Sequence, residues 1–278
     1  MELGMTTKWT IHKYEQGHIS QQEDEVAIEF ALTVHVNGIE YATMVCSPFH
    51  LEELVIGFLA SEGIIRTFNA IHSLHVDIER GYAYVELQTP LEEDSLHRSK
   101  RFIGSCCGKS REFYYQEDAK TARTVYTPLT LTKDEALHLM KAFQDESRSM
   151  HQTGGIHQAS IAVSDSLVFT SLDIGRHNAL DKCYGYMLKE NLPRKDKVIV
   201  FSGRLSSEVV LKVSKMGVGI VLSPSAPTDL ALRMAEDLQV TALGFVRRDR
   251  FNVYTWGSRI VEHNALDKEG EKDEGSRA

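Results

Sequence analysis

Two adjacent cysteines are the residues of this chain best suited to covalent chemistry. Cys106 and Cys107 lie in the segment GSCCGKS, between basic residues at positions 100, 101, 109 and 111. Positive charge near a thiol favours the reactive thiolate. The segment has neither a helical nor an alternating pattern, which indicates a loop, where reactive groups are usually presented. We expect an exposed nucleophile here; a buried turn and a strained vicinal disulfide are the alternatives.

The other two cysteines, Cys46 and Cys183, lie among apolar residues, which predicts inert core positions for both. Four cysteines, two of them adjacent, make a poor framework for the disulfides of a secreted protein. A reducing compartment fits this cysteine usage better.

Two short motifs combine glycine with basic side chains. TGGIHQA (153–159) has paired glycines that let a ligand approach closely, or simply form a tight turn next to a solvent-facing histidine. DIGRHNALDK (173–182) places Arg176 and His177 at the start of a predicted helix, where an anion would also meet unpaired backbone donors. The alternative for the second motif is a structural pair between Asp173 and Arg176.

Several familiar chemistries are not supported. The chain has 12 histidines but no HExxH motif, and no HxE followed by PCxxC as in zinc deaminases. GSCCGKS has three residues between its glycines, where a phosphate loop of the GxxxxGKS type has four. The sequence therefore predicts no protein-bound metal and argues against nucleotide hydrolysis.

The stretch from 197 to 246 is expected to hold the elements that position a ligand. It reads strand, helix, strand, helix, strand, a pattern typical of parallel strands with helices packed on the sheet. Ligands of such sheets bind beyond the carboxyl ends of the strands. Three polar turns follow the three strands, at 202–204, 223–228 and 247–250, and we expect them to converge on one site.

The first half of the chain is predicted to be smaller and α+β. Alternating residues flank Asn37-Gly38, a strong hairpin signal, and apolar residues recur at helical spacing over 51–65. Thr132 and Glu135 form a capping box that opens a helix and a new unit. We therefore divide the chain into an α+β part (1–130) ending in the cysteine loop, an α/β cofactor-binding domain (131–268) and a disordered tail (269–278).

Composition limits the classes of partner. A formal charge of −8 and a pI near 5.8 argue against nucleic-acid binding, so any anion site must be local. The N-terminus lacks the apolar core of a signal peptide, and no run of 18 apolar residues could span a membrane. These features predict a soluble, cytoplasmic protein.

Taken together and in order, the motifs resemble the FdhD/NarQ family of formate dehydrogenase accessory proteins over roughly residues 25 to 257. The motifs that carry the resemblance are SPFHLEELVIGFLASEGII (47–65), SCCGKS (105–110), TGGIHQA (153–159), DIGRHNALDK (173–182), SGRLSSE (202–208), SAPT (225–228) and GFVRRDRFNVYT (244–255).

The resemblance implies a sulfurtransferase. A cysteine desulfurase would load a persulfide onto a loop cysteine, and the protein would pass that sulfur to the molybdenum cofactor, bis(molybdopterin guanine dinucleotide), for formate dehydrogenase. It also implies a homodimer and an α/β fold whose C-terminal domain is cytidine deaminase-like, with a mixed, largely parallel sheet. The zinc site of true deaminases is missing from this sequence.

The resemblance also indicates the site residues. Many members carry a CxxCG loop, and aligning on the Cys-Gly pair puts Cys107 at the second cysteine and Gly104 at the first, so Cys107 is the expected carrier and Cys106 an understudy or resolving thiol. A carrier needs a mobile, low-pKa thiolate. Phosphates and guanines of the cofactor suit arginines and hydroxyls. The expected cofactor-binding residues are Phe245, Val246, Arg247, Arg248, Asp249, Arg250, Ser225, Thr228, His177 and Arg176.

Two other functions compete with sulfur transfer. A chaperone could bind the cofactor and insert it into formate dehydrogenase without sulfur chemistry, and it would keep its activity when Cys106 and Cys107 are both replaced by alanine. A base deaminase is suggested only by analogy of fold, which is poor support for a function. Absence of stoichiometric zinc from the purified protein would remove it.

Overall fold

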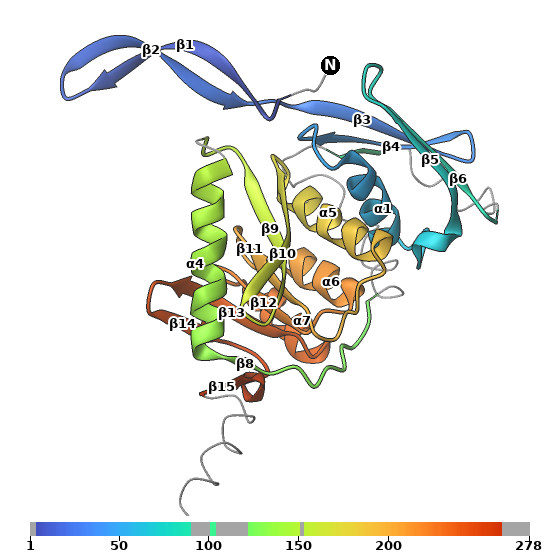
Figure 1. Ribbon diagram of the computed structural model, residues 1–278, viewed down its shortest axis with the longest axis vertical. Helices are drawn as coiled ribbons and strands as arrows, with labels where there is room; N and C mark the ends of the chain where they lie inside the picture. The colour runs from blue at the N-terminus through green and yellow to red at the C-terminus, as the bar shows by residue number, and fades with distance from the viewer. Residues whose placement is uncertain (1–3, 90–100, 104–121, 151–152, 263–278) are drawn as a thin grey trace, which may run out of the picture. The chain divides into compact units, whose positions relative to one another are not determined.

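In the computed structural model, residues 4–89, 101–103, 122–150 and 153–262 are described (Figure 1). The chain forms two compact units, each assembled from separate stretches of sequence. Unit 1 comprises residues 1–121, 147–159 and 171–192; unit 2 comprises 122–146, 160–170 and 193–278. The predicted disordered tail lies outside the described residues. Mixed α/β structure is confirmed.

Unit 1 contains a five-stranded sheet in the order β5-β6-β3-β4-β7. Strands β3 and β4 form the hairpin predicted at Asn37-Gly38, where both residues have positive φ, 50° and 77°. Buried and partly exposed residues alternate along β3, which is the pattern of a sheet with one covered face. The strands are β3 (Phe30–Val36), β4 (Ile39–Cys46), β5 (Ile71–Asp77), β6 (Tyr82–Leu87) and β7 (Arg101–Ile103), and a short helix, η1 (Phe68–Ala70), precedes β5.

Two helices, α1 (Leu51–Ser61) and α5 (Arg176–Lys189), pack closely against each other in unit 1. Their contact depends on two glycines. A Cβ added to Gly57 would lie 1.7 Å from the Asp181 carbonyl oxygen, and one added to Gly185 would lie 1.8 Å from that of Glu53. The backbones therefore approach to a distance that no larger residue allows.

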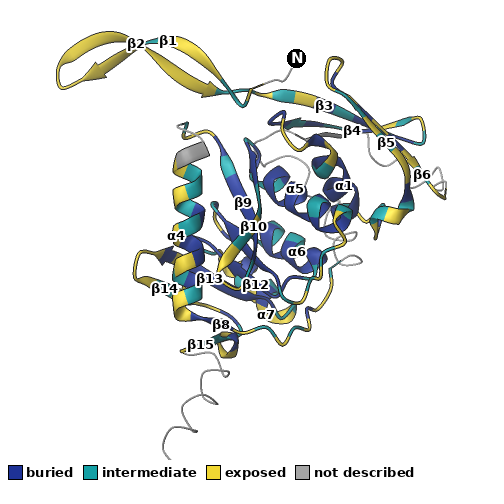
Figure 2. Cartoon of the chain, viewed as in Figure 1, coloured by how far each residue is buried: buried dark blue, intermediate teal, exposed yellow. Residues whose placement is uncertain are grey.

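An N-terminal hairpin also belongs to unit 1. Its strands β1 (Thr6–Glu15) and β2 (His18–Ala27) pair over their full length through a turn at Gln16-Gly17. Almost every residue of the hairpin is exposed, as its yellow colour in Figure 2 shows. An isolated two-stranded ribbon has no buried face of its own to stabilise it.

Unit 2 is centred on a six-stranded sheet in the order β10-β9-β11-β12-β13-β14. Strands β11, β12 and β13 are parallel, and β14 pairs antiparallel with β13. The predicted alternation of strands and helices from 197 to 246 is confirmed. The elements are β9 (His157–Val163), β10 (Ser166–Asp173), β11 (Val198–Phe201), α6 (Ser207–Met216), β12 (Ile220–Leu222), α7 (Asp229–Asp237), β13 (Thr241–Arg247) and β14 (Arg250–Val253). The first residues of β9 (157–159) and the last residues of β10 (171–173) belong to unit 1.

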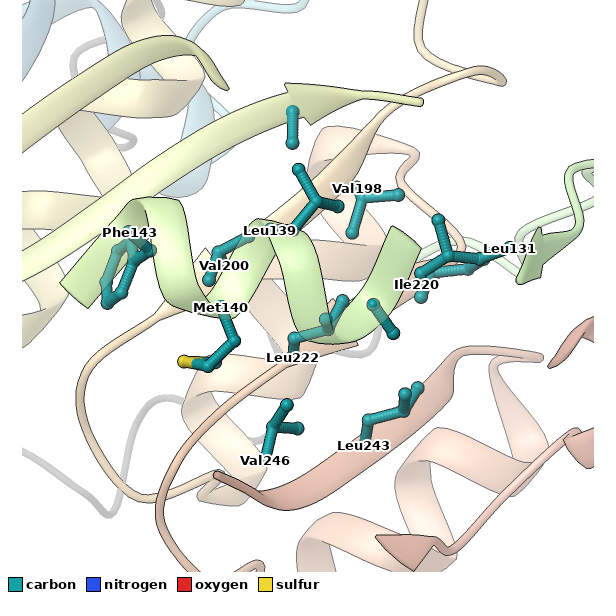
Figure 3. Close-up of a cluster of buried hydrophobic side chains, with 12 residues drawn as sticks. Leu131, Leu139, Met140, Phe143, Val198, Val200, Ile220, Leu222, Leu243 and Val246 are labelled. Carbon is teal, nitrogen blue, oxygen red and sulfur yellow. The ribbon is translucent and has the colours of Figure 1, made fainter. Parts of the chain in front are cut away.

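Helix α4 (Lys133–Met150) covers one face of this sheet. Leu139, Met140 and Phe143 point toward the apolar side chains of β11, β12 and β13 (Figure 3). The strand residues that face the other way, such as Ile199 and Val221, are equally buried, so both faces of the sheet are covered. The predicted capping box is confirmed at the start of α4. The Thr132 amide donates to Glu135 (2.7 Å) and the Glu135 amide donates to the Thr132 hydroxyl (3.1 Å).

Short elements close unit 2 near its C-terminal end. Strand β8 (Leu131–Thr132) pairs in parallel with β15 (Ile260–Val261), which follows the helix η2 (Gly257–Arg259). The guanidinium of Arg259 is bound to the carbonyl oxygens of Gly219, Gln239 and Val125. One side chain thereby ties three segments of the unit together.

Candidate functional site

In unit 2, the three predicted turns at the carboxyl ends of β11, β12 and β13 do meet. The Ser223 hydroxyl donates to the Gly203 carbonyl oxygen at 2.7 Å, and the Leu205 amide donates to that of Ala226 at 3.2 Å. These bonds join the first turn to the second. Parallel strands bring their carboxyl ends to one edge of a sheet, which is why the turns converge there.

The third turn is bound to the second by both main chain and side chain. The Phe245 and Val246 amides donate to the carbonyl oxygens of Ser225 (3.1 Å) and Ser223 (3.0 Å). The Arg247 Nε donates to the Pro224 carbonyl oxygen at 3.1 Å. The turns 202–204, 223–228 and 247–250 thus form one connected surface.

Glycine at position 244 makes this approach possible. A Cβ there would lie 3.0 Å from the Tyr254 ring, 3.1 Å from the Pro227 ring and 3.2 Å from the Ser225 carbonyl oxygen. Phe245 and Arg248 have positive φ, 53° and 47°, which is unusual for residues with a side chain and is often found at functional turns. The turn is therefore held in a specific shape by its neighbours.

Three arginines give this turn its charge. Arg247, Arg248 and Arg250 are exposed and, together with Asp249, line a hollow of about 540 Å³. None of the three forms an ion pair with a carboxylate in the described part of the chain. Guanidinium groups bind phosphates in a bidentate manner and also pair with guanine. This arrangement can hold an anionic nucleotide.

The residues predicted to form this site differ in whether their polar groups are still available to a ligand. Val246 is fully buried in the core of unit 2, and the amides of Phe245 and Val246 already donate within the surface of the turns. The Thr228 hydroxyl accepts from the Ala231 amide as the N-cap of α7. The exposed arginine side chains and the half-exposed Phe245 ring are the groups that remain available to a ligand.

In unit 1, the two histidine motifs come together. The Ser171 hydroxyl donates to the Ala159 carbonyl oxygen at 3.2 Å, which sets β9 beside β10. His157 precedes Ala159 by two residues and Asp173 follows Ser171 by two, and Arg176 and His177 begin α5 shortly after Asp173. The charges of Asp173, Arg176 and His177 all act on the pKa of His157, so these side chains lie near one another. The sequence alone did not predict that these motifs are neighbours.

A buried ion pair holds this turn in place. Asp173 and Lys182, both fully buried, approach to 2.7 Å. Asp173 also accepts from the amides of Ser47 (3.0 Å) and Gly175 (2.7 Å) and from the side chain of Asn178 (2.9 Å). The partner of Asp173 is therefore Lys182, and the alternative of a pair with Arg176 is wrong.

The buried cysteines are the core positions that were predicted. Cys46 and Cys183 have no exposed surface. Burial raises the pKa of each thiol to about 12, and Asp173 adds to the effect at Cys46. The carrier candidates Cys106 and Cys107 lie outside the described residues.

Among the described residues, no three side chains of His, Cys, Asp or Glu lie close enough together to hold a metal ion. The predicted absence of a protein-bound metal stays a prediction. In the same part of the chain no helix is long and apolar enough to cross a bilayer.

Known proteins resemble this chain over nearly its whole length. The model of the FdhD/NarQ family matches residues 27–261. The sulfur carrier protein FdhD of Geobacillus kaustophilus is 55% identical over 90% of this chain and 95% of its own, and that of Bacillus subtilis is 52% identical over 91% and 96%. A crystal structure from Desulfotalea psychrophila, described as a formate dehydrogenase accessory protein, superimposes with a TM-score of 0.76 over 93% of this chain and 100% of that one. At 22% identity this match concerns the fold alone.

Proposed function

Because the chain belongs to the FdhD/NarQ family, we propose that it is a sulfurtransferase that carries persulfide sulfur from a cysteine desulfurase to the molybdenum cofactor of formate dehydrogenase. The acceptor is bis(molybdopterin guanine dinucleotide). The observation that carries the proposal is the unpaired arginine turn at the strand ends of unit 2, in a chain whose relatives at 52–55% identity are named sulfur carriers.

Cys107 is the proposed carrier. Its thiolate attacks the outer sulfur of a persulfide on the donor enzyme, so that a new S–S bond forms on Cys107 while the donor's S–S bond breaks and the donor cysteine leaves as a thiolate. No net oxidation occurs in this step. Cys106 is the second thiol of the loop and the candidate for a resolving role.

The acceptor is proposed to lie at the arginine turn. Arg247, Arg248 and Arg250 supply charge and paired donors for its phosphates and guanines, and the Ser225 and Thr228 hydroxyls lie on the adjoining turn. Asp249 contributes an acceptor for the amino edge of a base. Arg176 and His177, which lie in unit 1, are separately proposed to contact the cofactor.

The remaining parts of the proposal come from the family resemblance. Formate dehydrogenase is the client, the desulfurase is the donor, and the protein is a homodimer. The proposed cytoplasmic location and the absence of nucleic-acid and membrane partners come instead from the sequence itself, through its cysteine usage, its net charge of −8 and its lack of an apolar run of 18 residues. The relation of the C-terminal domain to cytidine deaminases is likewise a prediction. The mixed sheet of unit 2, with three adjacent parallel strands, is compatible with it.

The test is sulfur loading followed by mass spectrometry. The protein, Cys106→Ala and Cys107→Ala are incubated with a cysteine desulfurase and cysteine, and intact mass and thiol-bearing peptides are measured. We expect one additional sulfur on wild type and on Cys106→Ala, and none on Cys107→Ala.

The chaperone alternative has a different outcome in the same experiment. If neither cysteine acquires sulfur and the double alanine variant still supports formate dehydrogenase activity in cells, the sulfurtransferase proposal falls. Cofactor binding with no sulfur loading would then identify an insertion chaperone.

A further inference from the structure

We propose that unit 1 contains a phosphate-binding site formed by Arg176, His177 and His157, and that His157 makes binding at this site tighter as the pH falls. The inference deepens the proposed function, because it rests on that function for the source of the phosphate, the diphosphate of the cofactor's nucleotide. It adds His157 to the proposed binding residues and assigns phosphate binding to the two histidine motifs, 153–159 and 173–182.

The first observation is the convergence of three basic side chains from two segments. His157 begins β9, whereas Arg176 and His177 begin α5, and the β9–β10 pairing brings the two starting points together. All three residues are half-buried, so they are partly shielded from water and still accessible to a small ligand. Charges in such surroundings interact more strongly than on an open surface.

The second observation is that the nearest acid cannot neutralise this cluster. The two carboxylate oxygens of Asp173 receive hydrogen bonds from Lys182, Ser47, Gly175 and Asn178 at 2.7 to 3.0 Å. A carboxylate has about four acceptor positions, so these bonds use the capacity of Asp173. Lys182 also cancels its charge.

Arg176 is consequently left with excess positive charge. No carboxylate in the described ranges forms an ion pair with it. The first turn of α5 begins at Gly175, which supplies no capping side chain, so the helix start adds partial positive charge. An incoming phosphate would be the counter-ion of Arg176 and its neighbours.

The lowered pKa of His157 is consistent with a site whose anionic ligand is not bound. Burial lowers the pKa of His157 most, the positive charges of Arg176 and His177 lower it further, and Asp173 alone opposes them. Protonation of the ring is thus disfavoured in the free protein. A bound phosphate would favour the protonated ring, so binding takes up a proton and strengthens as the pH falls.

The geometry also explains the glycine that precedes Arg176. A Cβ at position 175 would lie 2.7 Å from the Asn178 amide nitrogen and 3.2 Å from an Asp173 carboxylate oxygen. The side chain of Asn178 therefore folds back over the turn to reach Asp173. The Asp173–Lys182 pair is thus buried at this turn, whereas Arg176 is only half-buried.

The experiment is calorimetric titration of the full chain with inorganic pyrophosphate and with GDP at pH 6 and pH 8. The background variant is Arg248→Gln, which weakens the arginine turn of unit 2 and leaves unit 1 untouched. In this background we expect pyrophosphate to bind several-fold more tightly at pH 6 than at pH 8, because a rise of one unit in the pKa of one histidine on binding changes the affinity by at most about tenfold.

Further substitutions in the same background assign the site. Arg176→Gln should reduce pyrophosphate binding at both pH values to the residual level that Arg247 and Arg250 of the arginine turn support, and Arg176→Lys should restore part of the loss, because a point charge replaces a bidentate donor. His157→Gln should retain the pH 8 affinity and lose the gain at pH 6. A merely structural role for His157 would lower both affinities together.

Other results would overturn the inference. Equal pyrophosphate affinity at pH 6 and pH 8, or unchanged binding in Arg176→Gln, contradicts it. The proposed function is tested separately by comparing GDP binding to the wild-type protein and to the Arg248→Gln variant. Arg248→Gln should weaken GDP binding even if the inference about unit 1 is wrong. Pyrophosphate binding without GDP binding at the unit 1 site would identify free phosphate as its ligand.

Discussion

At the scale of single residues, the structure removes two of the four cysteines as candidate nucleophiles. Cys46 and Cys183 are fully buried, and burial raises the pKa of each thiol to about 12. A thiol of that kind has almost no thiolate at neutral pH and is not a nucleophile. The proposed sulfur chemistry is therefore assigned to Cys106 and Cys107, the remaining cysteines of the chain.

Thiol labelling should reveal this difference directly. With an aromatic disulfide reagent at pH 8, we expect two thiols to react in the native protein and four in denaturant. A variant with Cys106→Ser and Cys107→Ser should show no fast native reaction. Rapid labelling of that double variant would mean that Cys46 or Cys183 is accessible, against their burial.

At the scale of elements, the contact of α1 with α5 supports the turn that carries Arg176. Gly57 and Gly185 allow the two backbones to touch. Polar side chains then join the helices. The Ser61 hydroxyl donates to Asp181 at 2.6 Å, and Lys189 pairs with Glu53 at 2.8 Å. Because α5 begins with Arg176 and His177, a displaced helix would also move these two side chains of the proposed phosphate site.

Substituting either helix glycine should therefore be strongly destabilising. A Cβ at Gly57 or Gly185 would overlap a backbone carbonyl group, which cannot move aside as a flexible side chain can. We expect Gly57→Ala and Gly185→Ala each to cost about 2 to 4 kcal/mol in denaturant unfolding. Gly154→Ala is the matched control, because no atom lies within 4 Å of its added Cβ, and it should remain within about 0.5 kcal/mol of wild type. Equal stability of all three variants would contradict the close helix contact.

At the scale of the whole molecule, positive charge is concentrated locally in a chain with net charge −8. Unit 1 carries the cluster of His157, Arg176 and His177, and unit 2 carries the arginine turn. Local clusters of this kind attract anions although the protein as a whole is acidic. The arginine turn also costs stability when no anion is bound, since its like charges repel.

Stability should therefore depend on pH in the acid range. The pKa values of His50 and His157 are lowered in the folded protein from an ordinary value of 6.5, mainly by burial. Below about pH 6.5 the unfolded chain binds more protons than the folded one, so stability is complete above this pH and decreases as the pH falls. The lowered pKa of Glu53 adds a further loss only below its ordinary value of 4.5.

Thermal unfolding measured from pH 8 to pH 5 tests this. The Tm should decrease below pH 6.5, less steeply in a His50→Gln, His157→Gln variant, and phosphate should restore part of the loss in wild type. A Tm that rises toward pH 5, or an equally steep decrease in the variant, would contradict the assignment of these two histidines.

Local pattern was enough to predict much of this protein. The Asn37-Gly38 hairpin, the capping box of α4 and the alternation of strands and helices from 197 to 246 each depend on residues close together in sequence. Parallel strands also bring their carboxyl ends to one edge, so the meeting of the three turns could be expected. The ordered motifs were likewise sufficient to identify the FdhD/NarQ family.

Other features were decided only by tertiary structure. Asp173 pairs with Lys182 and not with Arg176, because the fold buries the lysine against Asp173 and leaves the arginine half-buried. His157 meets Arg176 through a strand pairing that neither motif encodes by itself. The β1–β2 hairpin was not predicted, since its exposed faces leave no apolar pattern. Spacing reports which face of an element is buried, whereas the partner of a polar side chain depends on segments that only folding brings together.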